Sequence, residues 1–217
     1  MKGLLIKDFG LMKGQKNFFF LMIAIAIGMA AFLDGSTFML SYLPFVLSLF
    51  TLSTISYDEF DNGNAFLFTL PVSRTEYAIE KYCLAFLLGC GAWVFALFFA
   101  GAFGVIRETA TIRETVMTAV MILPVLMMLQ AVMIPFQLKF GGEKGRIALI
   151  GVFGLLFVCA TIAVKAARLF GIDPENVINS LPTVSMGIVI AIMFIAAVIV
   201  LLISAKISST IMNNKEF

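Results

Sequence analysis

Six long apolar runs determine what this 217-residue chain can fold into. They cover residues 17–33, 37–56, 82–106, 116–136, 147–164 and 184–205. A helix that crosses a membrane needs about 20 consecutive apolar residues. Lipid gives the backbone no hydrogen-bond partners, so each run must be a helix or part of a closed barrel. Barrel strands are short and alternate between apolar and polar residues, which these runs do not. The sequence therefore predicts an all-α integral membrane protein, a single domain 1–217 with six transmembrane helices.

The lysines and arginines are distributed unevenly between the two sides of this arrangement. Eleven of the fifteen precede the first run or lie near the segments after the second, fourth and sixth runs. Positive charge is retained on the cytoplasmic side of a membrane. We therefore expect both termini and segment 57–82 to be cytoplasmic, and residues 34–36 to form a short turn outside.

The N-terminal residues 1–16 carry a helical pattern of their own. Leu5, Phe9 and Met12 follow spacings of four and three, and the lysines around them can face water or anionic headgroups. This pattern predicts an amphipathic helix that lies along the cytoplasmic membrane surface. A basic tail that only fixes the topology is the alternative.

Several absences narrow the function. The chain has no histidine, which removes His-based metal sites, Ser–His nucleophile pairs and zinc metalloprotease motifs. The cores of the six runs contain no Asp, Glu, Lys or Arg, although ion-driven transporters usually carry such a group at membrane depth. The loop Gly-x-x-x-x-Gly-Lys-Ser/Thr that holds nucleotide phosphates is also missing. If this protein moves a cargo uphill, we expect the energy to enter from another subunit.

The segment 57–82 is the longest stretch that cannot lie in lipid. Asn62–Gly63 is a turn signal, and Pro71 interrupts a helix because it lacks a backbone N–H and restricts the residue before it. The apolar run 65–70 between these breaks is too short to cross a bilayer. It could lie at the membrane surface or insert into a groove of a partner.

The end of this segment carries a helix-start signal. Ser73 and Glu76 have the spacing of a capping box, and Val72 and Tyr77 have that of a hydrophobic staple. We therefore expect a helix to begin at Arg74 and to continue into the third span.

These residues together resemble a known family. The pattern consists of Glu59, Gly63, Phe66-Leu67, Leu70-Pro71-Val72-Ser73-Arg74, Glu76 and Lys81, between the second and third spans of a six-span chain. It resembles the membrane subunits of ABC-2 type ABC transporters. The start of the segment and its Leu-Pro-Val-Ser-Arg core are most similar to short bacterial permeases related to exporters of phenol-soluble modulins and other antimicrobial peptides. The family often has Gly-Thr-x-Glu after the turn, whereas Asn64, Ala65 and Phe66 follow Gly63 here.

The resemblance implies a role for 57–81 as the coupling segment, whose helix docks in a groove of a separate ATPase subunit. The residues implied are Tyr57, Asp58, Glu59, Gly63, Phe66, Leu67, Phe68, Leu70, Pro71, Arg74 and Glu76. Glu59 and Arg74 would make polar contacts to the ATPase, and Phe66, Leu67 and Phe68 would form an apolar anchor. An amphipathic helix before the first span is also a feature of this family.

The resemblance further implies the partners and the location. Two ABC ATPase subunits would bind ATP and Mg²⁺, so this chain would hold no cofactor or metal and would not itself be an enzyme. A second membrane subunit, identical or related, would complete the pathway, and no nucleic acid is expected. The protein would lie in the bacterial cytoplasmic membrane and export an amphipathic peptide or another hydrophobic cargo by alternating access.

Two other function classes remain open from the sequence. A membrane-embedded enzyme would need paired acidic residues or a nucleophile with its base, and Asp58–Glu59 is the only candidate pair. A non-transporting immunity or scaffold protein that binds a toxin or a sensor could use the same fold. Stimulation of a partner's ATP hydrolysis by a candidate cargo would separate the transporter from the scaffold.

Overall fold

The computed structural model describes residues 1–32, 37–60, 63–142 and 185–215, with isolated residues between 144 and 165. Within these residues the chain is helical and contains no strand, which confirms the all-α prediction. The main helices are α1 (Lys2–Gly14), α2 (Lys16–Phe32), α3 (Thr37–Glu59), α4 (Gly63–Leu67), α5 (Arg74–Ile106), α6 (Ile112–Phe140) and α9 (Met186–Asn214).

Four of these helices, α3, α5, α6 and α9, are long and apolar enough to cross a membrane. A fifth candidate is the pair α1–α2, which bends by 69° at its junction. The predicted span 147–164 falls mostly outside the described residues, so the total of six spans stays a prediction. The predicted outside turn at 34–36 also lies outside the described residues.

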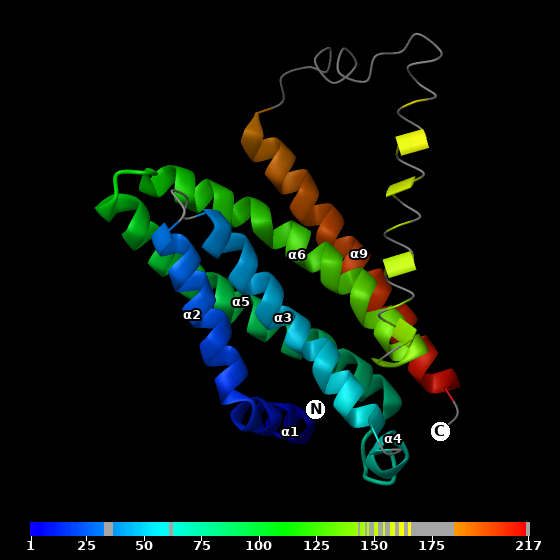
Figure 1. The fold of residues 1–217 in the computed structure, drawn as a ribbon. Helices are drawn as coiled ribbons and strands as arrows, with labels where there is room; N and C mark the ends of the chain where they lie inside the picture. Colours follow the sequence, from blue (N-terminus) through cyan, green and yellow to red (C-terminus); the bar gives the residue numbers. More distant parts are fainter. Residues whose placement is uncertain are drawn as a thin grey trace.

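The long helices pack side by side, and α1 turns across one end of them (Figure 1). The packed pairs are α2 with α3, α3 with α5 and α6, α5 with α6 and α9, and α6 with α9. Both termini lie at the same end as the short helix α4 (Figure 1). We call this the α4 end, and the opposite end, where α5 passes to α6, the far end.

The two ends have different cores. The core at the α4 end includes large side chains from six helices, among them Leu4, Ile55, Tyr77, Tyr82 and Met212. The core at the far end is built mainly from small residues, and those of α5 repeat every four positions. They are Ala26 and Ala30 of α2, Ala92, Ala96 and Ala100 of α5, and Ala119 of α6. Small residues allow helix backbones to approach closely in a membrane.

Candidate functional site at the α4 end

The described residues of the predicted coupling segment 57–81 lie at the α4 end of the bundle (Figure 1). Helix α3 continues to Glu59, and α4 begins at Gly63. A Cβ atom at Gly63 would lie 2.8 Å from the Asp58 carbonyl oxygen, closer than real Cβ contacts. Glycine is therefore the residue that the start of α4 accepts without a shift of the backbone.

The start of α5 is fixed by the capping box that the sequence predicts. The backbone N–H of Glu76 donates to Ser73 Oγ at 3.2 Å, and the N–H of Ser73 donates to Glu76 Oε2 at 3.2 Å. Val72 packs against the core that contains Tyr77, as expected for a hydrophobic staple. Pro71 precedes this start and is exposed. The capping box thus fixes the residue at which α5 begins, at the α4 end of the bundle.

The three residues of the predicted apolar anchor face different ways. Phe66 is 72% exposed, whereas Leu67 is buried in the α4-end core. The Phe68 ring packs edge-on against Tyr77, with 5.7 Å between the ring centroids. Of the three, Phe66 is therefore the side chain that a partner can reach.

Other large side chains of the segment share the exposure of Phe66. Tyr57, Phe60 and Leu70 are all exposed, and Phe60 as much as Phe66. The sequence analysis did not single out Phe60, although a phenylalanine between Glu59 and Asp61 was a visible signal. We call Tyr57, Phe60, Phe66 and Leu70 the apolar tip.

A buried ionic cluster lies directly behind this tip. Lys81 of α5 places its ammonium 2.5 Å from Asp8 Oδ2 of α1 and 2.9 Å from Asp58 Oδ2 of α3. It also donates to Thr54 Oγ1 at 3.1 Å. Both Lys81 and Asp8 have no exposed surface. Buried charges of this kind require paired partners, since desolvation alone would be prohibitive.

Three further side chains belong to the cluster, and one of them is the buried Glu80, whose Oε2 lies 3.5 Å from the Lys81 ammonium. Lys7 pairs with Asp58 and lies 2.9 Å from Asp8 Oδ1. The Tyr77 hydroxyl donates to Asp58 Oδ2 at 3.1 Å. Asp58, a predicted ATPase-coupling residue, is thus held by three side chains of its own chain.

A second set of polar contacts holds the segment from the C-terminal side. Lys215 lies 2.8 Å from Glu59 Oε1 and donates to the Leu138 carbonyl oxygen at 2.9 Å. The N–H of Gly142 donates to Glu59 Oε2 at 2.9 Å. We call these contacts the C-terminal brace.

Arg74 joins the same brace from the start of α5. Its guanidinium donates to the carbonyl oxygens of Asn213 at 2.9 Å and of Lys215 at 2.8 Å. These carbonyls end α9, and a cation is favourable at a helix C-terminus. The structure therefore gives Glu59 and Arg74 partners within the chain. The predicted contacts of these two residues to an ATPase stay a prediction.

Helix α1 contacts the bundle through a face that the sequence analysis did not identify. Leu4 and Asp8 are buried, whereas Leu5 and Met12 are half-buried and Phe9 is exposed. Asp8 was missed because its partner Lys81 is 73 residues away in the chain. The i, i+4 spacing of Leu4 and Asp8, which places both residues on one face of the helix, was the one signal in the sequence for this contact face.

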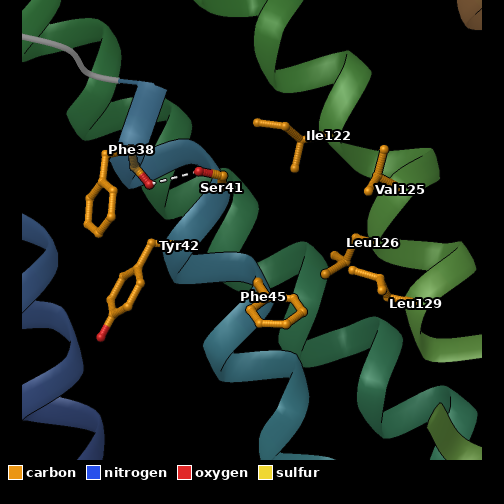
Figure 2. A pocket seen from close by; sticks show the side chains of 8 residues that line it. All are labelled: Phe38, Ser41, Tyr42, Phe45, Ile122, Val125, Leu126 and Leu129. Atoms are coloured by element: carbon orange, nitrogen blue, oxygen red, sulfur yellow. Dashed lines mark hydrogen bonds between the residues drawn. The ribbon is translucent and has the colours of Figure 1, made fainter. Parts of the chain in front are cut away.

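An apolar groove lies nearer the far end, between α3 and α6. It has a volume of about 320 Å³ and is lined by Phe38, Ser41, Tyr42, Phe45, Ile122, Val125, Leu126 and Leu129. Figure 2 shows Phe45 pointing into the space between the two helices, and the Ser41 hydroxyl turned back to the Phe38 carbonyl oxygen at 3.1 Å. The Tyr42 hydroxyl lies 3.1 Å from Met22 Sδ. The groove therefore offers hydrocarbon surface to a ligand and few free polar groups.

Within the described part of the chain, no group of three or more His, Cys, Asp or Glu side chains has the geometry of a metal site.

One comparison with known proteins gives a match. The model of a family described as "ABC-2 family transporter protein" matches residues 3–213. No curated protein and no solved structure matches the chain significantly.

Proposed function

Because the chain belongs to the ABC-2 family of transporter proteins, we propose that it is the permease subunit of an ATP-driven exporter. Separate ATPase subunits supply the energy and bind ATP and Mg²⁺. They dock at the α4 end, which then faces the cytoplasm together with both termini. The family match confirms the resemblance to ABC-2 membrane subunits. The relation to short bacterial peptide exporters belongs to the proposal.

The observation that carries the proposal is the exposed apolar tip on a segment that ion pairs hold to the helix bundle. Phe66 projects from α4 with 72% of its surface exposed, at the end where α1, α3 and α5 meet. Tyr57, Phe60 and Leu70 of the same segment are exposed as well. Exposed apolar surface favours a site of interaction, and aromatic residues are the usual anchors of protein interfaces. Behind this tip, ion pairs hold the segment to several long helices. A force applied to the tip is therefore transmitted to the bundle.

The groove between α3 and α6 favours a hydrophobic or amphipathic cargo. Its lining is almost entirely hydrocarbon, and the two hydroxyls at its side already have partners within the chain. A small ion would find no ligand there. Two copies of the chain, or this chain with a related one, form the pathway in the bacterial cytoplasmic membrane.

The test is an affinity pulldown of the tagged, detergent-solubilised protein from its native membrane, followed by mass spectrometry. We expect a stoichiometric ATPase with a phosphate-binding loop to copurify with the wild-type chain. Phe66→Ser should remove most of it, because the tip loses its central anchor.

The matched control is Phe20→Ser in α2. Phe20 is also strongly exposed but lies on a membrane helix away from the tip. Retention of the ATPase by Phe66→Ser and Phe20→Ser alike would reject the tip as the docking site. Recovery of the intact protein alone, or with a toxin or sensor only, would reject the transporter and favour the immunity or scaffold protein.

A further inference from the structure

Lys81 is the last residue of segment 57–81 and is placed where three helices meet. Its ammonium contacts Asp8 of α1, together with Asp58 and Thr54 of α3, while Lys81 itself belongs to α5. An ammonium has three N–H donors. Two of them are used in hydrogen bonds to Asp8 Oδ2 at 2.5 Å and Thr54 Oγ1 at 3.1 Å, and Asp58 Oδ2 forms an ion pair with the same nitrogen at 2.9 Å.

The same cluster attaches α1 to the rest of the molecule. Lys7 and Asp8 both take part in it, and Leu4 packs one turn earlier in the α4-end core. Helix α1 is thus held at two successive turns, by an apolar contact and by ion pairs. Its junction to α2 is the single residue Gln15 at the 69° bend, whose side-chain amide donates to the Tyr57 hydroxyl of α3.

We propose that Lys81 is a positioning residue that ties α1 to the coupling segment, so that α1 moves with this segment when the ATPases close. The inference rests on the proposed function. Movement of the tip reaches Asp58 at the end of α3 and Lys81 near the start of α5. The shared ammonium passes it to Asp8, and α1 passes it on to α2. The N-terminal helix is then part of the transmission as well as a contact to the membrane surface.

The test measures distances between spin labels in the full-length protein, with its three cysteines replaced by serine. One label pair joins α1 to α4, through Lys13→Cys and Ala65→Cys, both at exposed positions. A second pair joins α1 to the far end, through Lys13→Cys and Thr109→Cys, and Thr109 is also exposed. The protein is measured alone, and then bound to its copurified ATPase without nucleotide and with ATP plus vanadate.

The decisive variant is the double substitution Asp8→Leu/Lys81→Met. It removes one acid and one base together, and apolar residues can replace a buried ion pair with little loss of stability. The control variant, Lys206→Met, removes one charge from an exposed position of α9 and leaves the cluster around Lys81 unchanged. The single variant Asp8→Asn keeps the shape of the side chain and is measured as well, so that the result does not depend on folding of the double variant.

In the wild-type and control proteins, we expect a narrow α1–α4 distance that ATP does not change, and an α1–far-end distance that shifts with ATP. In Asp8→Leu/Lys81→Met the α1–α4 distance should broaden and the ATP-driven shift of α1 should become smaller, because only the partly exposed Lys7 then still pairs with Asp58. Asp8→Asn should show the same changes to a smaller degree. A purely structural ion pair would leave the ATP-driven shift intact in any variant that folds.

Wild-type behaviour of both Asp8 variants in both label pairs would overturn the inference, as would an α1–far-end distance that ATP leaves unchanged in the wild-type complex. If no ATPase copurifies, the proposed function fails by itself. The α1–α4 distance of the isolated chain then still decides whether Lys81 ties α1 to the segment.

Discussion

The two ends of the helix bundle are held together in different ways. At the α4 end, charged and aromatic side chains from α1, α3, α5 and α9 make directional contacts around the coupling segment. At the far end, alanines of α2, α5 and α6 pack closely, and the Trp93 indole donates to the Ala119 carbonyl oxygen at 2.8 Å. Ion pairs fix both distance and direction, whereas small-residue packing fixes mainly the distance between helices. The comparison shows that directional polar contacts hold the α4 end, whereas close packing of small residues holds the far end.

The largest effect is expected from Lys81→Met at the α4 end. The substitution leaves Asp8, Asp58 and the buried Glu80 with too little positive charge. Breaking a buried ion pair by removal of one partner costs about 3–5 kcal/mol. The free energy of unfolding can be measured by denaturant titration in detergent, followed by the fluorescence of the single tryptophan. Lys206→Met, at an exposed position of α9, is the control and should change little. Equal losses of stability in the two variants would show that the ionic cluster stabilises the α4 end no more than an exposed lysine does.

The far end should respond to added volume rather than to lost charge. Ala96 is fully buried among the alanines of α5 and its neighbours. Ala96→Leu should therefore destabilise the protein by about 1–3 kcal/mol through overpacking. Ala102→Leu, at an exposed position of the same helix, is the matched control in the same titration. If the two substitutions were equally mild, the far end would not be closely packed.

The two capping boxes allow a direct comparison of the ends. Ser73 caps α5 at the α4 end, and Thr111 caps α6 at the far end with the same geometry. Ser73→Ala and Thr111→Ala should each cost about 1 kcal/mol of stability. Ser73→Ala alone should also weaken copurification of the ATPase, because it loosens the base of the coupling segment. Equal loss of the ATPase from both variants would contradict this division of roles.

The smallest effect is expected in the C-terminal brace. Glu59 and Lys215 are partly accessible to solvent, with 18% and 24% of their side chains exposed. A double-mutant cycle with Glu59→Gln and Lys215→Met should give a coupling energy of about 1 kcal/mol. The value should fall with added salt, because solvent screens accessible charges. A larger coupling energy that does not depend on salt would show that the brace behaves like a buried ion pair, as expected for the cluster at Lys81.

The sequence predicted the helices of this fold well where local chemistry determines them. Pro71 and the Ser73–Glu76 capping box define the start of α5, and both signals are complete within a few residues. The apolar runs located the other described membrane helices because lipid demands such runs. The ends of α6 and α9 extend beyond the predicted spans, since hydrophobicity marks the part of a helix in lipid and not its continuation into water.

The candidate site was predicted only in part, because its polar contacts join distant parts of the chain. The sequence identified the segment and Phe66, but it did not indicate that Leu67 and Phe68 pack inward. It assigned Glu59 and Arg74 to a partner, whereas the structure shows contacts to the C-terminal residues. Arg74 and Asn213 are 139 positions apart, and no local pattern relates residues at such a separation. The predicted roles of the segment in coupling stay a prediction.

The most direct test of the central claim, that the α4 end receives the ATPase, is photocrosslinking in native membranes. A photoreactive phenylalanine analogue would replace Phe66 at the α4 end or Ile106 at the far end, and both side chains are strongly exposed. We predict an adduct from position 66 with a protein that carries a phosphate-binding loop, and none with that protein from position 106. The same adduct from both positions, or no ATPase adduct from position 66, would contradict the account.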